Sequence, residues 1–455
     1  MSTAFTRENY GRPAAPIRMV HLGIGNFTRA HQAYYTEKAP DAAEWGIAAF
    51  TGRRPDQARA LAPQEGLYTL IIRGAEGVNY EVVSSLSKVH EATDAEALRG
   101  YFASPDLAVM TSTVTEAGYM RAPDGSLDVE NKDVAADIDA LRGDPAAEVK
   151  TTPGKVVSGL LARRAAGAGA MTILPCDNLP ENGEAFQRVI VDMARAVDPS
   201  LESWISENIA FATCMVDRIT PATTDEDRTE VARECGYDDA SPVPTEAFSE
   251  WVVAGEFPAG RPRWEDAGVT IVDNVTPFEE RKLWMLNGSH SLMAYAATIR
   301  GFATVGEAIV DPEVRGWVNE WWDVAARHLS VESDDYRQAL LDRFENPNIR
   351  HLLAQIAADG SQKIPVRIVP ALRDEIAEGR LPDGPIRAIA AWTQHLLGHG
   401  APVKDAQEEL VKELKAGDLD ETIANVLGFL GEDLAANQEL VARVKALALD
   451  LVPEK

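Results

Sequence analysis

Three side chains capable of proton-transfer chemistry lie close together in residues 277–291, which read PFEERKLWMLNGSHS. They are Lys282, Asn287 and His290. In a regular helix, at about 100° per residue, Asn287 and His290 lie about 140° and about 80° around the axis from Lys282. All three side chains can therefore face one cleft.

An amine, an amide and an imidazole that converge suit proton transfer at an alcohol or a carbonyl. A desolvated lysine can lose its charge and act as a base, an amide can polarise the oxygen, and an imidazole can donate or accept a proton. Because a lysine with the ordinary pKa of about 10.4 is a poor base at neutral pH, burial must lower the pKa of Lys282. The structural alternative is a solvated lysine, an asparagine that ends the helix before Gly288, and a core histidine.

A glycine turn near the amino terminus has the context of a dinucleotide site. Residues 17–22 predict a buried strand, and GIGNFTRAH leads from it into a helical stretch. A GxG turn in this context lets a pyrophosphate approach the backbone and the helix amides. The expected cofactor contacts are Gly23, Gly25, Asn26 and Phe27. Thr28 replaces the usual third glycine, so an ordinary tight turn is the alternative.

The residues that follow the next strands bear on the choice of cofactor. Residues 46–51 form a second strand, after which Arg53 and Arg54 are compatible with the ribose phosphate of NADP, while Asp56 is the nearby carboxylate that suits the ribose of NAD. These residues leave the choice between NAD and NADP open. Residues 107–115 predict another strand, whose end should bring Thr115 and Glu116 to the cofactor cleft.

Two further strands end in polar clusters. The strand at residues 170–174 leads into PCDNLPENG, for which a turn with side-chain caps is the alternative to a site. The apolar run at residues 211–216 leads into Asp217 and Arg218, which either form a local ion pair or present one group to the cleft.

From residue 277 onward the periodicity becomes helical, for example in residues 312–328, 349–358 and 385–397. A chain of 455 residues exceeds the size of one core. The sequence predicts a Rossmann-type dinucleotide-binding domain in residues 1–276 and a helical substrate or catalytic domain in residues 277–455, thus an α/β fold followed by a mostly α-helical part.

Composition excludes several partners and compartments. The formal net charge of −27 disfavours nucleic acid and anionic membranes. Three widely spaced cysteines, none in a CxxC pair, predict neither disulfides nor a structural metal site. We find no signal peptide and no apolar run of the roughly 18 to 20 residues that span a bilayer. The expectation is a soluble, cytoplasmic protein, a monomer or weak homo-oligomer, that acts on a small molecule.

Six motifs in order resemble the mannitol dehydrogenase family, the polyol-specific long-chain dehydrogenases and their hexuronate reductase relatives. The motifs are HLGIGNFTRAHQAYY, TVTEAGY, PCDNLPENG, MVDRITP, KLWMLNGSH and DGSQKIP. The resemblance implies an NAD(P)-dependent oxidoreductase that needs no metal and interconverts a linear polyol, such as D-mannitol, with its 2-ketose.

The resemblance also implies a role for each site residue. Lys282 is the general base, Asn178 and Asn287 polarise the reacting oxygen, and His290 positions the substrate hydroxyl. The remaining assignments are Asp217 and Lys363 as substrate contacts and Glu279 as a carboxylate that assists proton exit.

One departure from the family pattern bears on the substrate. Gln355, also at a substrate-contact position, stands where mannitol-oxidising members carry an arginine, eight residues before the lysine of DGSQK. This departure favours reductases that act on fructuronate, so D-fructuronate and D-mannonate are the alternative pair. A catalytically silent nucleotide sensor would not need the lysine, both asparagines and the histidine together, and a zinc-dependent dehydrogenase would need a ligand cluster that the sequence lacks.

Overall fold

The computed structural model describes residues 4–415 and 417–452. Residues 1–3, 416 and 453–455, which fall inside the predicted domain bounds, lie outside the described residues. The chain separates into two compact units, Met1–Thr276 and Pro277–Lys455.

The first unit is built on a six-stranded parallel sheet with the order β5-β2-β1-β6-β7-β8. Its strands are β1 (Ile17–Leu22), β2 (Gly46–Phe50), β5 (Leu86–His90), β6 (Val109–Ser112), β7 (Met171–Pro175) and β8 (Ile209–Phe211). The chain reverses direction across the sheet on either side of β1. In such sheets, ligands bind outside the carboxyl ends of the strands at the point of reversal.

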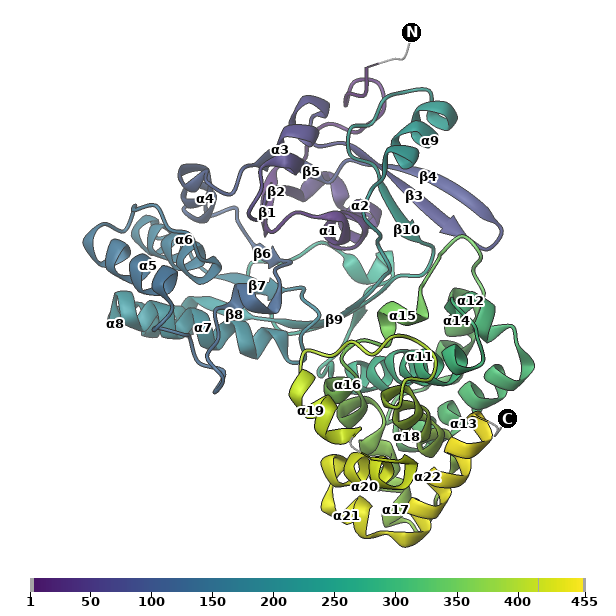
Figure 1. The fold of residues 1–455 in the computed structure, drawn as a ribbon. Coiled ribbons are helices and arrows are strands. Elements are labelled where there is room, and N and C mark those ends of the chain that lie inside the picture. The colour runs from purple at the N-terminus through teal and green to yellow at the C-terminus, as the bar shows by residue number, and fades with distance from the viewer. Residues whose placement is uncertain (1–3, 416, 453–455) are drawn as a thin grey trace. The chain divides into compact units, whose positions relative to one another are not determined.

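The side chains of the central strands alternate between two hydrophobic cores. Val20 and Leu22 of β1 pack toward one face, which is covered by the helices α4 to α8 (Figure 1). Met19, one position away, belongs to the core on the opposite face, together with α2 and Trp251. The covering helices are α4 (Ala95–Phe102), α5 (Lys132–Gly143), α6 (Thr152–Ala166), α7 (Asn182–Val197) and α8 (Pro199–Asn208) on the first face, and α1 (Asn26–Ala30), α2 (Gln32–Lys38) and α3 (Asp56–Leu61) elsewhere.

Two small sheets complete the first unit. One has the order β10-β3-β4 and contains the antiparallel pair β3-β4, and the other has the order β12-β11-β9. Their strands are β3 (Tyr68–Gly74), β4 (Gly77–Val83), β10 (Val243–Glu246), β9 (Thr213–Asp217), β11 (Glu250–Ala254) and β12 (Thr270–Ile271), and α9 (Asp225–Cys235) lies between β9 and β10 in the chain.

The second unit is helical in all its regular elements within the described residues. They are α10 (Thr276–Arg281), which begins at the unit boundary, η5 (Lys282–Gly288), α11 (Ser289–Ile299), α12 (Val305–Ile309), α13 (Pro312–His328), α14 (Asp334–Phe344), α15 (Leu353–Ile356), α16 (Gly360–Arg367), α17 (Val369–Ala377), α18 (Asp383–Leu396), α19 (Glu408–Leu414), α20 (Leu419–Leu430), α21 (Glu432–Ala436) and α22 (Gln438–Leu451). The predicted α/β and helical fold classes are thus confirmed.

One predicted helix is mostly absent. Residues 349–358 have helical periodicity, yet only Leu353–Ile356 is helical. The preceding residues instead pair with the chain before α12, where Val305 N–H donates to the His351 carbonyl over 3.0 Å and Leu353 N–H to the Ala303 carbonyl over 3.0 Å. Long-range backbone pairing has therefore overridden the local pattern.

No helix among residues 4–415 and 417–452 combines the length and apolar character that crossing a bilayer requires.

Candidate active site

The glycine turn after β1 joins the strand to α1 and is packed against the end of β6. Gly23 has φ +96°, and a Cβ there would lie 2.3 Å from the Thr113 carbonyl oxygen, so this position requires glycine. Gly25 differs, because a Cβ there would meet only the Gly23 carbonyl oxygen, at 3.9 Å. The protein's own packing does not require a glycine at position 25, whereas close approach of a pyrophosphate does. The turn therefore fits a dinucleotide.

Thr28 explains why the third glycine of the motif is dispensable. Its Oγ1 lies 2.5 Å from the Thr113 Oγ1 and 2.8 Å from the His21 Nε2. His21 is fully buried, and burial lowers its pKa to about 3, so its ring is neutral. Side-chain hydrogen bonds thus hold α1 to β1 and β6, where a third glycine would otherwise permit close packing.

The side chains of the expected cofactor contacts have internal partners. The Asn26 amide donates to the Pro221 carbonyl over 2.7 Å and accepts from Arg29 over 2.7 Å, and Phe27 stacks on His31. The Asn26 side chain therefore ties α1 to the loop after β9. Its backbone N–H lies in the first turn of α1, where helix N–H groups lack intrahelical partners.

The other expected cofactor residues lie at exposed positions. Thr115 precedes η3 (Glu116–Tyr119), and Glu116 pairs with Arg121 over 3.2 Å. Asp56 begins α3 and lies 3.7 Å from Arg54, in an exposed pair. The carboxylate and the guanidinium that bear on NAD or NADP selection are thus neighbours.

The carboxyl end of β7 leads into Asn178 through the buried Asp177. The Asp177 carboxylate accepts from the Val114 N–H over 2.6 Å and from the Tyr119 hydroxyl over 2.7 Å. Asn182 reaches the same loop, because its Nδ2 donates to the carbonyls of Asp177 (3.0 Å) and Cys214 (2.7 Å). These contacts fasten the turn that presents Asn178, whose side chain is exposed. Asp177 and Asn182 were not predicted as site residues, although both stand in PCDNLPENG.

We expect stability to depend on pH through Asp177. Burial raises the pKa of its carboxyl from 3.8 to about 7, although the bonds from Tyr119, Val114 and Ser112 offset part of the rise. Between about pH 4 and about pH 7 the unfolded chain therefore loses this proton while the folded protein keeps it. Stability should fall as pH rises through this window, by at most about 1.4 kcal/mol per pH unit for one proton.

The variant Asp177→Asn should lack this contribution, because its amide does not titrate. The amide can still accept from the Val114 N–H and donate to the hydroxyls of Tyr119 and Ser112. Urea unfolding of both proteins at pH 5 and pH 7 measures the difference, and the wild type should lose stability relative to the variant at the higher pH. An identical pH dependence of the two proteins would contradict the assignment.

Asp217 ends β9 and is buried, in register with Glu250 of β11. The neighbouring Arg218 stacks over Tyr34 and donates to the carbonyls of Ala30 (2.5 Å) and Glu246 (3.0 Å). Arg218 therefore binds backbone carbonyls.

In the second unit, Lys282 and Asn287 lie in η5, which is π-helical, although a regular helix was expected. A π-helix forms i→i+5 hydrogen bonds, so residues five positions apart are separated by roughly one turn. Lys282 and Asn287 therefore lie nearer to one face than a regular helix would allow. Both side chains are half-buried, and Glu279 is half-buried in α10, three residues before the lysine.

His290 follows in α11 and is buried among cationic groups. Its ring lies 4.9 Å from that of His351 and 5.0 Å from that of Phe344. The Nε2 atom has no hydrogen-bond partner among the described residues. Burial and, next, the charge of His351 lower the pKa of His290 well below its usual value, so the ring is neutral. A neutral imidazole nitrogen suits a substrate hydroxyl.

Lys363 and Gln355 differ in their surroundings. The Lys363 Nζ donates to the carbonyls of Ile356 (3.0 Å) and Ala358 (2.5 Å), and burial lowers its pKa. The charge of Lys363 also contributes to the lowered pKa of His290, so these two predicted residues are electrostatic neighbours. Gln355 lies on α15 with an exposed side chain.

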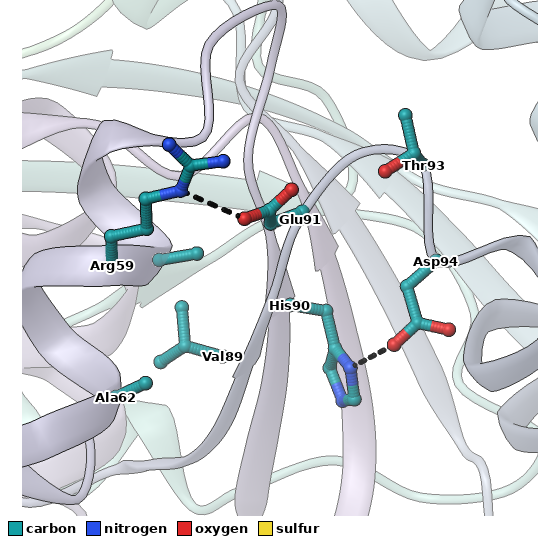
Figure 2. Close-up of a pocket in the computed structure, with 8 residues that line it drawn as sticks. Arg59, Ala62, Val89, His90, Glu91, Thr93 and Asp94 are labelled. Atoms are coloured by element: carbon teal, nitrogen blue, oxygen red, sulfur yellow. Dashed lines mark hydrogen bonds and ion pairs between the residues drawn. The ribbon is translucent and has the colours of Figure 1, made fainter.

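A separate open pocket of about 400 Å³ lies beside α3 and the end of β5 (Figure 2). Its charged and imidazole side chains pair with one another, His90 with Asp94 over 2.7 Å and Arg59 with Glu91 over 3.0 Å. None of the predicted site residues lines it. Among the described residues, no group of three histidine, cysteine or acidic side chains is arranged to hold a metal ion.

Comparison with known families accounts for both units. Residues 17–266 match the mannitol dehydrogenase Rossmann domain, and residues 274–451 match the mannitol dehydrogenase C-terminal domain. The chain belongs to the mannitol dehydrogenase family. Membership confirms the resemblance drawn from the motifs and the enzyme class that it implied, a nicotinamide-dependent alcohol dehydrogenase.

Relatives within the mannitol dehydrogenase family differ in substrate. The chain is 33% identical to the D-mannonate oxidoreductase of Escherichia coli (strain K12), over 97% of this chain and 94% of that protein. A D-sorbitol dehydrogenase structure in substrate-free form has a TM-score of 0.88 and 31% identity, covering 96% of this chain and 93% of that one. A Pseudomonas fluorescens mannitol 2-dehydrogenase, in ternary complex with NAD and D-mannitol, has a TM-score of 0.74 and 32% identity, covering 98% and 93%.

Proposed function

We propose that this protein is a metal-independent, NAD-dependent dehydrogenase that interconverts a linear polyol and its 2-ketose, of the D-mannitol and D-fructose type. The observation that carries the proposal is the π-helical form of the segment that contains Lys282 and Asn287, since residues five positions apart in such a segment are separated by roughly one turn. The family has a solved member that binds NAD and D-mannitol.

The glycine turn supports the cofactor. Gly23 and Gly25 with the backbone of Asn26 and Phe27 would hold the pyrophosphate of NAD, and Asp56 its ribose. Bound there, NAD would supply the acceptor for the hydride of the carbinol carbon.

Side chains of the protein supply the remaining chemistry. Lys282, uncharged, takes the hydroxyl proton as the hydride departs and returns it in the reverse direction. The amides of Asn178 and Asn287 donate to the oxygen that gains charge, a function that a zinc ion performs in other dehydrogenases. Glu279 passes the proton outward.

Other residues orient the substrate. His290 binds the hydroxyl beside the reacting carbon through its neutral imidazole, and Asp217 and Lys363 bind the rest of the hydroxyl chain. Gln355, exposed in this structure, is the remaining predicted substrate contact.

A second candidate is reduction of a hexuronate, D-fructuronate to D-mannonate. Gln355 in place of an arginine favours it, as does the similarity to a D-mannonate oxidoreductase. The cationic groups around His290, among them Lys363 and Arg367, suit a substrate carboxylate.

A panel of D-mannitol, D-arabinitol, D-sorbitol, D-fructuronate and D-tagaturonate, each with both nicotinamide nucleotides, tests the proposal by the change in nicotinamide absorbance. We expect oxidation of a polyol with NAD, at a rate that a chelator leaves unchanged. Turnover of the uronates alone would favour the second candidate. Absence of turnover with every substrate, or inactivation by the chelator, would contradict the proposal.

A further inference from the structure

Two tryptophan side chains bind the backbone of the π-helical segment. Both come from consecutive positions of α13. The Trp321 Nε1 donates to the Trp284 carbonyl over 2.8 Å, and the Trp322 Nε1 donates to the Met285 carbonyl over 2.9 Å. Both tryptophans are fully buried. An indole N–H can only donate, so at this depth it requires an acceptor. Two consecutive carbonyls of η5 provide the acceptors.

The next two carbonyls of the segment also receive side-chain donors. The Ser289 hydroxyl shares its one proton between the carbonyls of Met285 (2.5 Å) and Leu286 (3.0 Å), and the Arg367 Nη1 donates to the Asn287 carbonyl over 3.3 Å. Four consecutive carbonyls, from residue 284 to residue 287, thus accept from side chains. A π-helical turn distorts the hydrogen-bond pattern of the flanking α-helices, and external donors stabilise the carbonyls that the distortion reorients.

Glycines let Trp321 approach the segment closely. A Cβ at Gly288 would lie 2.7 Å from the Trp321 Nε1, so only glycine leaves room for the indole there. A Cβ at Gly384 of α18 would lie 2.8 Å from the Trp321 backbone nitrogen. Trp321 is therefore closely packed at its indole and at its backbone, which makes its N–H a well-fixed donor.

We propose that Trp321 and Trp322 are positioning residues that hold η5 in its π-helical form and thereby orient Lys282 and Asn287 for proton transfer. In a regular helix these two residues would lie about 140° apart around the axis, whereas in the π-helical form they approach one face. The inference rests on the proposed function, since it assumes that Lys282 is the base.

The direct test removes each N–H and keeps the shape of the side chain. Site-specific incorporation of 3-benzothienylalanine at position 321 or 322 replaces the indole nitrogen with sulfur. We expect kcat for polyol oxidation to fall by about 10- to 100-fold, as a misplacement on the order of 1 Å does. The limb of the pH profile that reports the base should also shift, while KM for NAD stays within about twofold. These kinetic values refer to the folded fraction of enzyme.

Trp317 provides the matched control. It lies on the same helix, is 5% exposed, and packs against Arg300 and Arg387. Benzothienylalanine at position 317 should leave kcat and the pH profile unchanged. Gly288→Ala is an independent variant, because it keeps both indoles and displaces Trp321, and it should lower kcat with the same shift of the pH profile.

Several results would overturn the positioning role. Wild-type kcat and an unshifted pH profile in the folded 321 and 322 variants would show that the N–H groups serve stability alone. Failure of both variants to fold, with the 317 variant folded, would do the same. If Lys282→Ala is inactive while these variants are fully active, the inference fails and the proposed function stands. An active Lys282→Ala would refute the proposed function itself.

Discussion

Replacement of Lys282 with alanine is expected to lower kcat for polyol oxidation by about 10²- to 10⁴-fold, the range for loss of a general base. Lys282 begins η5 in the second unit, whereas the glycine turn that would hold NAD lies in the first. The affinity for NAD, measured by the fluorescence of bound NADH and by competition with NAD, should therefore remain within about twofold of the wild type.

Lys412→Ala controls for the general loss of a lysine. The Lys412 side chain is largely exposed and pairs with Glu409 on α19 over 2.6 Å. Its removal should leave kcat unchanged. Unimpaired turnover by Lys282→Ala would remove the assigned base, and loss of NAD affinity in parallel with kcat would indicate damage to the fold.

Asn178→Ala and Asn287→Ala should each lower kcat by on the order of 10²-fold or more, as loss of one oxyanion donor does. Asn178 follows β7 at the carboxyl end of the parallel sheet, and Asn287 lies in η5. If the two amides donate to the same oxygen, the losses in the double variant should not simply multiply, because residues that share a partner couple energetically.

Asn79→Ala is the matched amide control. Asn79 is exposed on β4, where its amide donates to Glu81 over 3.1 Å. Its loss should leave kcat and KM unchanged. If Asn178→Ala and Asn287→Ala raise KM for the polyol with kcat intact, these amides bind the ground state only, contrary to the role assigned to them.

Strong local patterns predicted much of the fold. The strand, glycine turn and helix near the amino terminus follow from the buried run at residues 17–22 and from GIGNF. The helix Pro312–His328 has the predicted bounds, because Asp311 caps its start with a side chain that accepts from the N–H groups of Glu313 and Val314.

The π-helical form of η5 could not be predicted in the same way. Over seven residues, α- and π-helical segments call for the same residue types, and the form adopted depends on donors from α13 that lie 37 residues away in the sequence. The sequence feature that corresponds to this form is the pair of consecutive tryptophans at positions 321 and 322, together with the glycine at position 288.

The structure also differs from the sequence prediction at two short strands. Residues 211–216 were interpreted as one apolar run, yet Ile209–Phe211 and Thr213–Asp217 belong to different sheets. Ala212 lies at the switch between them, where Cβ atoms at Gly183 and Gly255 would approach it to 2.6 Å and 2.7 Å. Such close packing depends on distant glycines, which local hydrophobicity does not reveal.

The predicted site residues lie in different surroundings. His290 and Lys363 are electrostatic neighbours in the structure, whereas Gln355 is exposed and Asn26 has internal hydrogen-bond partners. Asp177 and Asn182 were missed because a sequence motif does not separate groups that touch a substrate from groups that hold the loop. The catalytic assignments stay predictions.

The central claim, that an uncharged lysine amine takes the proton, is tested most directly by the pH dependence of kcat/KM for polyol oxidation in the wild type and in Lys282→Ala. We predict that the wild-type rate rises with pH through one ionisation well below the ordinary lysine value of about 10.4. The residual rate of Lys282→Ala should lack that ionisation. Persistence of the same limb in the variant would show that another group is the base.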